Sequence, residues 1–187
     1  MSVLSSPLGL RHPIAGVDGL ALRDLSLQQR SGVRGAGARA YLVQQSYPVP
    51  SAPNQLVPAA SGAWVMSLSH REFWLLQPEQ KAIASAMQGE ALADDVWPLY
   101  CQHSHAWLQL AGEPRAEVMA TLCGVDLSQA VFPEGSVVQT QVARVTSVIA
   151  HHAEGPDGVF SLFVDQSLAV YLWEALEDAI TGFDCST

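Results

Sequence analysis

The amino-acid sequence predicts an α+β protein built from two split-βαβ (ferredoxin-like) halves. Strand-like and helix-like segments follow one another in a similar order twice along the 187 residues, which favours an α+β arrangement. In each half a strand runs through a glycine-containing break into a helix, at Gly35-Ala36-Gly37 and at Gly112-Glu113-Pro114. We therefore predict an N-terminal arm over 1–19, a first half over 20–95 and a second half over 96–187, fused as one compact unit.

The first half opens with an arm, two extended segments and a helix. Residues 1–16 carry Ser, Pro and Gly with little periodicity, which predicts a loosely held arm. Apolar and polar side chains alternate over 20–25, and we expect a strand over 28–33. A helix over 38–45 follows the glycines, and four prolines within 47–58 predict a long irregular connection.

A hairpin and a helix complete the first half. The apolar and aromatic segments 62–68 and 73–76 flank the polar residues 69–72, which is typical of a β-hairpin. Pro78 then begins an alanine-rich segment of good helix formers, so we expect a helix over 78–88.

The second half starts with extended segments over 96–102 and 106–110. They lead into a helix that begins near Glu113, with Pro114 in its first turn, where the missing N–H costs nothing. Cys123-Gly124 is the break that follows this helix.

Three strands and a C-terminal helix finish the chain. Alternation predicts strands over 137–145, 147–152 and 159–164. Ser167 is placed to cap a helix over 168–180 that has one apolar face, and Gly182 is placed to end it.

Composition argues against several classes of partner and in favour of another. The net charge is −9, which disfavours binding to phosphate backbones or to anionic membranes, so we expect neither nucleic-acid nor membrane binding. Charged residues make up only 14% of the chain, below the usual quarter of a soluble domain, while apolar residues make up 49%. A surface this poor in charge favours burial of part of it by a partner.

Cysteine usage and the N-terminus predict a cytoplasmic protein. Cys101, Cys123 and Cys185 have neither a paired nor a metal-type spacing, which suits a reducing compartment. The N-terminal residues lack the features of a signal peptide, and no apolar run is long enough to span a membrane.

Two motifs could carry chemistry, and each has a simpler explanation. Residues 35–40 fit the dinucleotide pattern G-x-G-x-x-A, but the expected acidic residue about 20 positions later is missing, so a tight strand-to-helix turn is favoured. Cys101, His103 and His105 would share one strand face, with His151 or His152 as a fourth metal ligand, or they would form a polar strand face that binds no metal. We predict no metal site.

No catalytic constellation stands out, and we predict no catalytic residues in this chain. Cys123 follows a helix C-terminus, where the helix dipole disfavours a thiolate. Aromatic residues are more informative, because the chain has more of them than one small core readily hides. They include Trp64, Phe73, Trp74, Trp97, Trp107, Tyr171 and Trp173. Trp173 either completes a wide buried stripe or is an exposed anchor for a partner.

Several segments between about 20 and 180 carry a family resemblance through their order and spacing. They are Arg23–Ser26, Arg30–Ala38, Val49–Asn54, Glu72–Leu76, Leu108–Arg115, Asp126–Leu127, Phe132–Gly135, Gln139–Thr140 and Val164–Trp173. Together they resemble the gamma subunit of heterotetrameric sarcosine oxidase, within the glycine-cleavage T-protein-like, folate-binding domains. The chain departs from that family at Asp165-Gln166, where members tend to carry two arginines.

The resemblance implies a T-protein-like fold and an accessory role. Larger subunits (alpha, beta and delta-like) would carry FAD, FMN and NAD, and the complex would oxidise sarcosine or another N-methyl amine and pass the carbon to tetrahydrofolate. This chain would hold no cofactor of its own, although tetrahydrofolate binding is possible. The candidate residues for the partner interface are Phe132, Pro133, Tyr171 and Trp173.

The alternative is a stand-alone folate-binding or aminomethyltransferase-like protein. It needs a carboxylate or arginine for the pterin and the glutamate, and Arg71, Glu72 and Arg144 are the candidates. A third reading, a metal protein that uses His103 and His105, is weaker.

Overall fold

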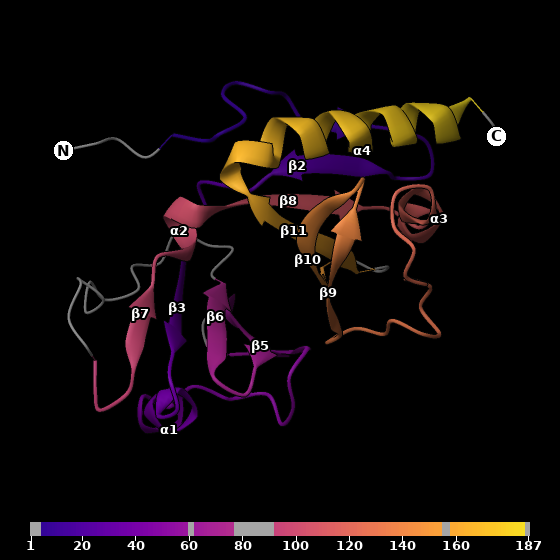
Figure 1. The fold of residues 1–187 in the computed structure, drawn as a ribbon. Helices are drawn as coiled ribbons and strands as arrows, with labels where there is room; N and C mark the ends of the chain where they lie inside the picture. The colour runs from indigo at the N-terminus through magenta and orange to yellow at the C-terminus, as the bar shows by residue number, and fades with distance from the viewer. Residues whose placement is uncertain (1–4, 60–61, 77–91, 155–157, 186–187) are drawn as a thin grey trace. The chain divides into compact units, whose positions relative to one another are not determined.

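The computed structural model describes residues 5–59, 62–76, 92–154 and 158–185. The chain divides into two compact units, each with its own antiparallel sheet (Figure 1). Unit 1 comprises Met1–Leu27 and His105–Thr187, and unit 2 comprises Gln28–Ser104. The boundary between the two units lies at Ser104/His105, and the described residues 5–27 belong with the C-terminal part of the chain because β2 pairs with β8.

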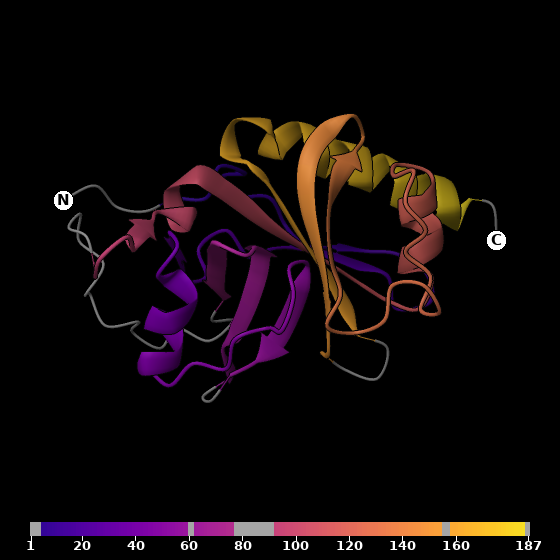
Figure 2. The same cartoon turned by 60° about the horizontal axis from the view of Figure 1, so that its bottom comes forward.

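Unit 2 contains a five-stranded sheet in the order β4-β5-β6-β3-β7. Its elements are β3 (Arg30–Arg34), α1 (Ala38–Gln44), β4 (Gln55–Pro58), β5 (Trp64–Ser69), β6 (Glu72–Leu76), β7 (Trp97–Leu99) and the short α2 (Cys101–Ser104). Helix α1 lies against one face of this sheet (Figure 2), where its Ala38 and Leu42 pack with Val33, Phe73 and Leu75.

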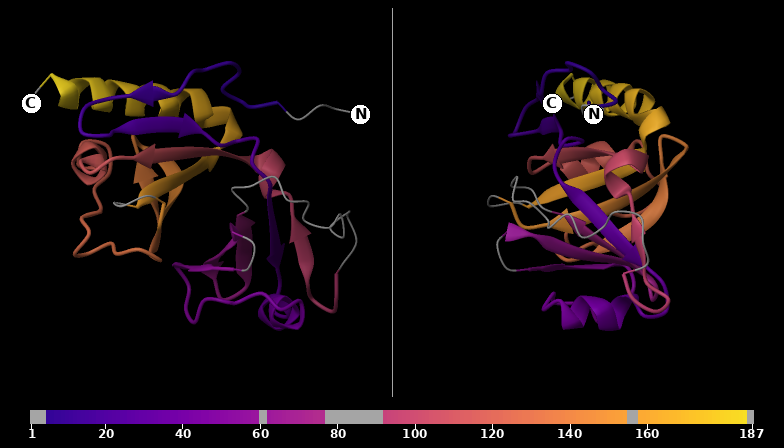
Figure 3. Two further views of the ribbon diagram at one scale, coloured as in Figure 1. Left: turned by 180° about the vertical axis from the view of Figure 1, so that it is seen from behind. Right: turned by 90° about the vertical axis from the view of Figure 1, so that its left-hand side faces the viewer.

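Unit 1 contains a six-stranded sheet in the order β1-β2-β8-β11-β10-β9. Its elements are β1 (Ile14–Ala15), β2 (Ala21–Asp24), β8 (His105–Ala111), α3 (Arg115–Ala120), β9 (Val137–Val142), β10 (Val145–His152), β11 (Val159–Asp165), a 3-10 turn (Gln166–Leu168) and α4 (Ala169–Asp184). Helix α4 runs along one face of the sheet (Figure 3), and its Leu172, Trp173 and Leu176 pack into the same core as Leu108 and Leu162.

The two units repeat one topology, and the predicted α+β class with two halves is confirmed. Each has a strand, a helix and three antiparallel strands, of which the last pairs with the first: β3-α1-β4-β5-β6 in unit 2 and β8-α3-β9-β10-β11 in unit 1. The order of these strands in the sheet is also the same, β4-β5-β6-β3 and β9-β10-β11-β8. Both glycine-containing breaks occupy the equivalent place, directly after the first strand.

Two strand predictions need correction. The proline-rich connection ends in a strand, β4, which pairs with β5 at the edge of the sheet, and Pro58 is tolerated because it is the last residue of an edge strand. The strand predicted over 137–145 ends at Val142, because Ala143 (φ 49°) and Arg144 (φ 70°) form a two-residue hairpin turn. Positive φ at both central residues is the geometry of a type I′ turn.

The N-terminal arm is tied down over the residues that the structure describes, contrary to the prediction. Ile14–Ala15 pairs with β2, and the Ser6 hydroxyl donates a hydrogen bond to the Asp24 carboxylate. Arg11 forms an ion pair with Glu174 of α4 at 2.7 Å. Leu8 is buried in the unit 1 core. These contacts make residues 5–19 part of unit 1.

The ends of α4 also differ from the prediction. Ser167 does not cap α4, whose N-cap residue, Leu168, makes no side-chain capping hydrogen bond. The Asp165 carboxylate instead caps the preceding 3-10 turn, where it accepts hydrogen bonds from the Ser167 hydroxyl and backbone N–H at 2.6 and 2.9 Å. Those hydrogen bonds lower the pKa of Asp165. The helix continues through Gly182 to Asp184. The helix predicted over 78–88 lies outside the described residues.

Candidate functional site

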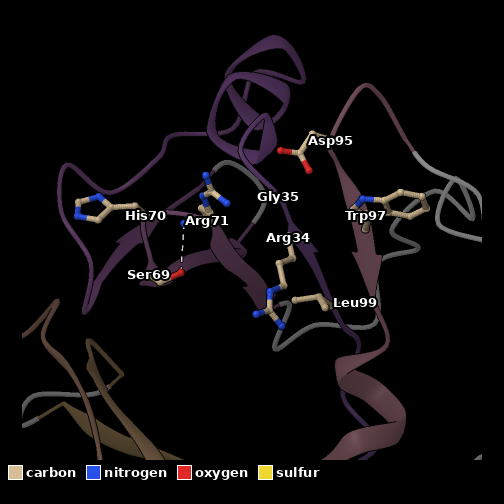
Figure 4. Close-up of a pocket in the computed structure, with 8 residues that line it drawn as sticks. All are labelled: Arg34, Gly35, Ser69, His70, Arg71, Asp95, Trp97 and Leu99. Carbon is tan, nitrogen blue, oxygen red and sulfur yellow. Dashed lines mark hydrogen bonds between the residues drawn. The ribbon is translucent and has the colours of Figure 1, made fainter.

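A pocket in unit 2 is the best candidate for a binding site. It has a volume of about 640 Å³ and lies where β3, the β5–β6 turn and β7 come together (Figure 4). Its lining residues are Arg34, Gly35, Ser69, His70, Arg71, Asp95, Trp97 and Leu99. In Figure 4 the His70 side chain extends away from the other labelled residues, so the imidazole flanks the pocket.

The glycine motif at residues 35–37 forms one wall of this pocket, and two of its backbone N–H groups donate hydrogen bonds to Asp95. The Asp95 carboxylate accepts a hydrogen bond from Ala36 N at 2.9 Å, and the Asp95 carbonyl accepts one from Gly37 N at 3.3 Å. Gly35 has φ 140°, and a Cβ there would lie 1.8 Å from the Asp95 carbonyl oxygen. The glycines are therefore needed for this close approach of the two backbones, as expected for a tight turn. The Ala36 and Gly37 N–H groups bond to Asp95 and are not available to a ligand.

Two arginines give the pocket its hydrogen-bond donors. Arg34 is 67% exposed, and its Nε lies 3.8 Å from Oε2 of Glu72, a distance that makes a weak ion pair. Arg71 is exposed, and its guanidinium has no hydrogen bond or ion pair with any described residue. The Ser69 hydroxyl accepts a hydrogen bond from Arg71 N at 3.1 Å, which makes Ser69 a turn residue. The arrangement can bind a ligand with acceptor groups.

The three predicted folate residues are divided between the two units. Arg71 lines the pocket and Glu72 lies beside it on β6, paired with Arg34. Arg144 is exposed at the β9–β10 turn of unit 1. Arg34 and Trp97 of the pocket were not predicted as folate residues. They stand far from Arg71 in the sequence and reach it only through the pairing of β3 with β6 and β7.

Unit 1 holds a buried polar network that the sequence analysis did not identify. Arg115 donates hydrogen bonds to the Gly112 carbonyl at 2.9 Å and to Nε2 of His151 at 3.1 Å. Because a guanidinium can only donate, Nε2 of His151 accepts and its Nδ1–H donates to the Phe132 carbonyl at 2.8 Å. Arg115 also lies over the Phe160 ring, 4.9 Å from its centroid. This network joins α3 to the sheet.

A second buried group involves His152. Ser161 Oγ accepts a hydrogen bond from the Trp107 indole at 2.7 Å and lies 2.8 Å from Nε2 of His152. Burial, with a smaller contribution from the charge of His151, lowers the pKa of His152 to about 4. The imidazole is thus neutral at physiological pH. Both histidines follow the short apolar run Val148-Ile149-Ala150, which is the sequence signal of their burial.

The proposed strand face of Cys101, His103 and His105 does not exist. Cys101–Ser104 forms the short helix α2, and His105 begins β8. Cys101 is buried, which raises the pKa of its thiol to about 12, whereas His103 is exposed. Among the described residues, no group of three His, Cys, Asp or Glu side chains is placed to hold a metal ion.

Two of the four predicted interface residues are buried. Trp173 is 1% exposed and completes the buried stripe of α4, the first of its two predicted alternatives. Phe132 packs with His151 and Phe160 inside unit 1. Tyr171 is 49% exposed, and its hydroxyl donates to the Ala143 carbonyl at 2.9 Å. Tyr171 and Pro133 therefore remain on the surface.

Comparison with solved structures establishes the fold. The chain is similar to a chain of heterotetrameric sarcosine oxidase from Corynebacterium sp. U-96, solved in complex with pyrrole 2-carboxylate. The TM-score is 0.76, with 23% sequence identity over 92% of this chain and 89% of that one. The fold is T-protein-like. This confirms the fold that the sequence resemblance implies.

A second structure supports the same conclusion. The chain is similar to the glycine cleavage system aminomethyltransferase T from Bartonella henselae, with a TM-score of 0.53 and 18% identity over 92% of this chain. The match covers 50% of the aminomethyltransferase, so this chain spans about half its length. No family model and no curated protein matches the sequence. Among the described helices, none is both long and apolar enough to cross a membrane.

Proposed function

We propose that this chain is an accessory, non-catalytic, gamma-like subunit of a heteromeric flavin-dependent oxidase. The oxidase would act on sarcosine or another N-methyl amine and be linked to one-carbon transfer to tetrahydrofolate. The observation that carries the proposal is the similarity in fold to a chain of heterotetrameric sarcosine oxidase, over about nine-tenths of both chains.

The polar groups buried in unit 1 support an accessory role over a catalytic one. His151 is bonded to Arg115 and to the Phe132 carbonyl, and Ser161 is bonded to both Trp107 and His152, so these side chains are held inside the unit. A general acid or base must reach its substrate, which these buried side chains do not. Cys101 has a pKa of about 12, so its thiolate, the nucleophilic form, is scarce at neutral pH.

The proposal assigns the redox chemistry to partners. FAD, FMN and NAD would be held by larger alpha, beta and delta-like subunits, in the cytoplasm. This chain would pack against them, which explains why charged residues make up only 14% of it. Pro133 and Tyr171 remain candidates for that interface because both are exposed.

A second candidate, a stand-alone folate-binding or aminomethyltransferase-like protein, is favoured by one observation. The guanidinium groups of Arg34 and Arg71 face the unit 2 pocket, where they could pair with the glutamate carboxylates of tetrahydrofolate. Calorimetric titration of tetrahydrofolate into the purified chain tests this candidate. Saturable heat in the wild type that is lost in Arg71→Ala would support it, and no heat in the wild type would exclude it.

Co-expression tests the accessory role. The chain and the larger subunits of an oxidase from the same organism would be produced together, with an affinity tag on this chain alone. We expect flavin-containing larger subunits to elute with it, and the same subunits produced without it to lose stability or yield. Elution of the chain alone, at its own 20.0 kDa, would contradict the proposal.

A further inference from the structure

Two aromatic side chains at β7 are unusually exposed. Trp97 is 56% and Tyr100 55% exposed, although tryptophan is on average a strongly buried residue type. Strand β7 is the last strand of the unit 2 sheet. Trp, Tyr and Arg are the residue types most enriched at the energetic centres of protein interfaces. This edge therefore has the composition of a contact surface.

Strand register places an arginine beside the exposed tryptophan. Arg34 on β3 is the direct cross-strand partner of Trp97 on β7 and of Glu72 on β6. Directly opposed residues of an antiparallel pair project from the same face of the sheet. Glu72 compensates Arg34 only weakly, because Nε and Oε2 are 3.8 Å apart and Arg34 is 67% exposed.

Two hydrogen-bond donors around this edge are available to a ligand. Within the described part of the chain, neither the Arg71 guanidinium nor the Trp97 indole N–H has a hydrogen-bond acceptor. Asp95 is the carboxylate among the lining residues, and its Oδ2 accepts the Ala36 N–H. A ligand that complements this surface would supply carboxylate oxygens.

We propose that Arg34, Arg71 and Trp97 form a docking surface for a carboxylate-bearing segment of a larger subunit. This inference rests on the proposed accessory function and locates the contact in unit 2. A protein segment fits better than a small ligand, because small-molecule sites bury most of their ligand, whereas the side chains here project from the surface. The two arginines would pair with carboxylates, and the Trp97 ring would be covered by apolar side chains.

The test measures binding of the full chain to the co-purified larger subunits by biolayer interferometry. Arg34→Glu/Arg71→Glu should weaken binding by at least about 30-fold, the size expected at an energetic centre. Trp97→Ala, which removes no charge, should weaken it by at least about tenfold. Arg23→Glu is the matched control, because it reverses an exposed arginine of unit 1 that neither proposal uses, and it should retain wild-type affinity. Wild-type affinity should also fall as salt is raised.

The outcomes separate this inference from the function on which it rests. If the wild-type chain does not bind the larger subunits, the accessory function fails, and the docking surface fails with it. If the wild type binds and the double variant binds equally well, the docking surface is wrong while the accessory function stands. Competition by free tetrahydrofolate at this surface, with subunit binding unaffected by the double variant, would assign the arginines to a small ligand instead. Thermal unfolding of each variant establishes that it is folded.

Discussion

His152 should make the stability of this protein fall between neutral and mildly acidic pH. The imidazole is 2% exposed and lies 2.8 Å from Ser161 Oγ, which also accepts the Trp107 indole N–H. Burial lowers the pKa of His152 to about 4 from an ordinary 6.5. Between these two pH values the unfolded chain binds a proton that the folded chain does not, so stability must fall as the pH falls through this window.

The size of the effect follows from the two pKa values. The full difference of 2.5 units (6.5 − 4) corresponds to about 3 kcal/mol of unfolding free energy, all of it lost by pH 4. Between pH 7 and pH 5, the part of the window that is easiest to measure, the loss is about 2 kcal/mol. Below pH 4 both states bind the proton, and the contribution of His152 levels off.

Urea unfolding at pH 7 and pH 5, followed by tryptophan fluorescence, measures this loss. His152→Gln is the matched variant, because glutamine can still bond to Ser161 but does not titrate. The wild type should lose about 2 kcal/mol more than His152→Gln between the two pH values, since every other titrating group is common to both proteins. Equal losses in the two proteins would show that His152 is not held neutral by burial, and the reasoning would be refuted.

Two pairs of substitutions test the local packing. Gly35→Ala should destabilise unit 2 by at least about 3 kcal/mol, because the new Cβ would clash with the Asp95 carbonyl at a residue with positive φ. Gly124→Ala is the control: the space around its Cβ is open, so stability should change by less than about 1 kcal/mol. Trp173→Ala should cost about 3–5 kcal/mol in urea unfolding and the half-exposed Tyr171→Ala about 1 kcal/mol. Similar costs within either pair would contradict the packing described.

Elements with a strong hydrophobic period could be predicted from the sequence, and elements defined by backbone geometry could not. β8 and β11 were found because they are apolar runs bounded by glycine or polar residues. The Ala143-Arg144 turn was not found, because neither residue is among the Asn, Asp and Gly that usually adopt its positive φ values. β4 was hidden by the prolines before it, although an edge strand tolerates a proline at its end.

The candidate site shows a second limit of sequence reasoning. The spacing of Cys101, His103 and His105 fits a strand face, but three residues at intervals of two do not distinguish a strand from a helical turn. The His103 N–H donates a hydrogen bond to the Tyr100 carbonyl, as in a helical turn, and Cys101–Ser104 forms the short helix α2. Arg34 and Trp97 have no sequence signal as a pair, because only the register of β3 against β7 makes them neighbours.

The repeated topology links the fold to the proposed role. Each unit uses its glycine-containing break to approach another backbone closely: Gly35 meets Asp95, and Gly112, at φ 108°, lies where a Cβ would be 2.6 Å from Leu20 N. In both places the loop between strand and helix packs against another backbone segment, which leaves no room for a bound phosphate. The repeats differ at the sheet edge beyond the first strand. Within the described ranges, β8 is followed in the sheet by β2 and β1, whereas β3 is followed by the short β7 alone. The exposed Trp97 and Tyr100 lie at that shorter edge, and this difference is the structural reason for expecting the partner there.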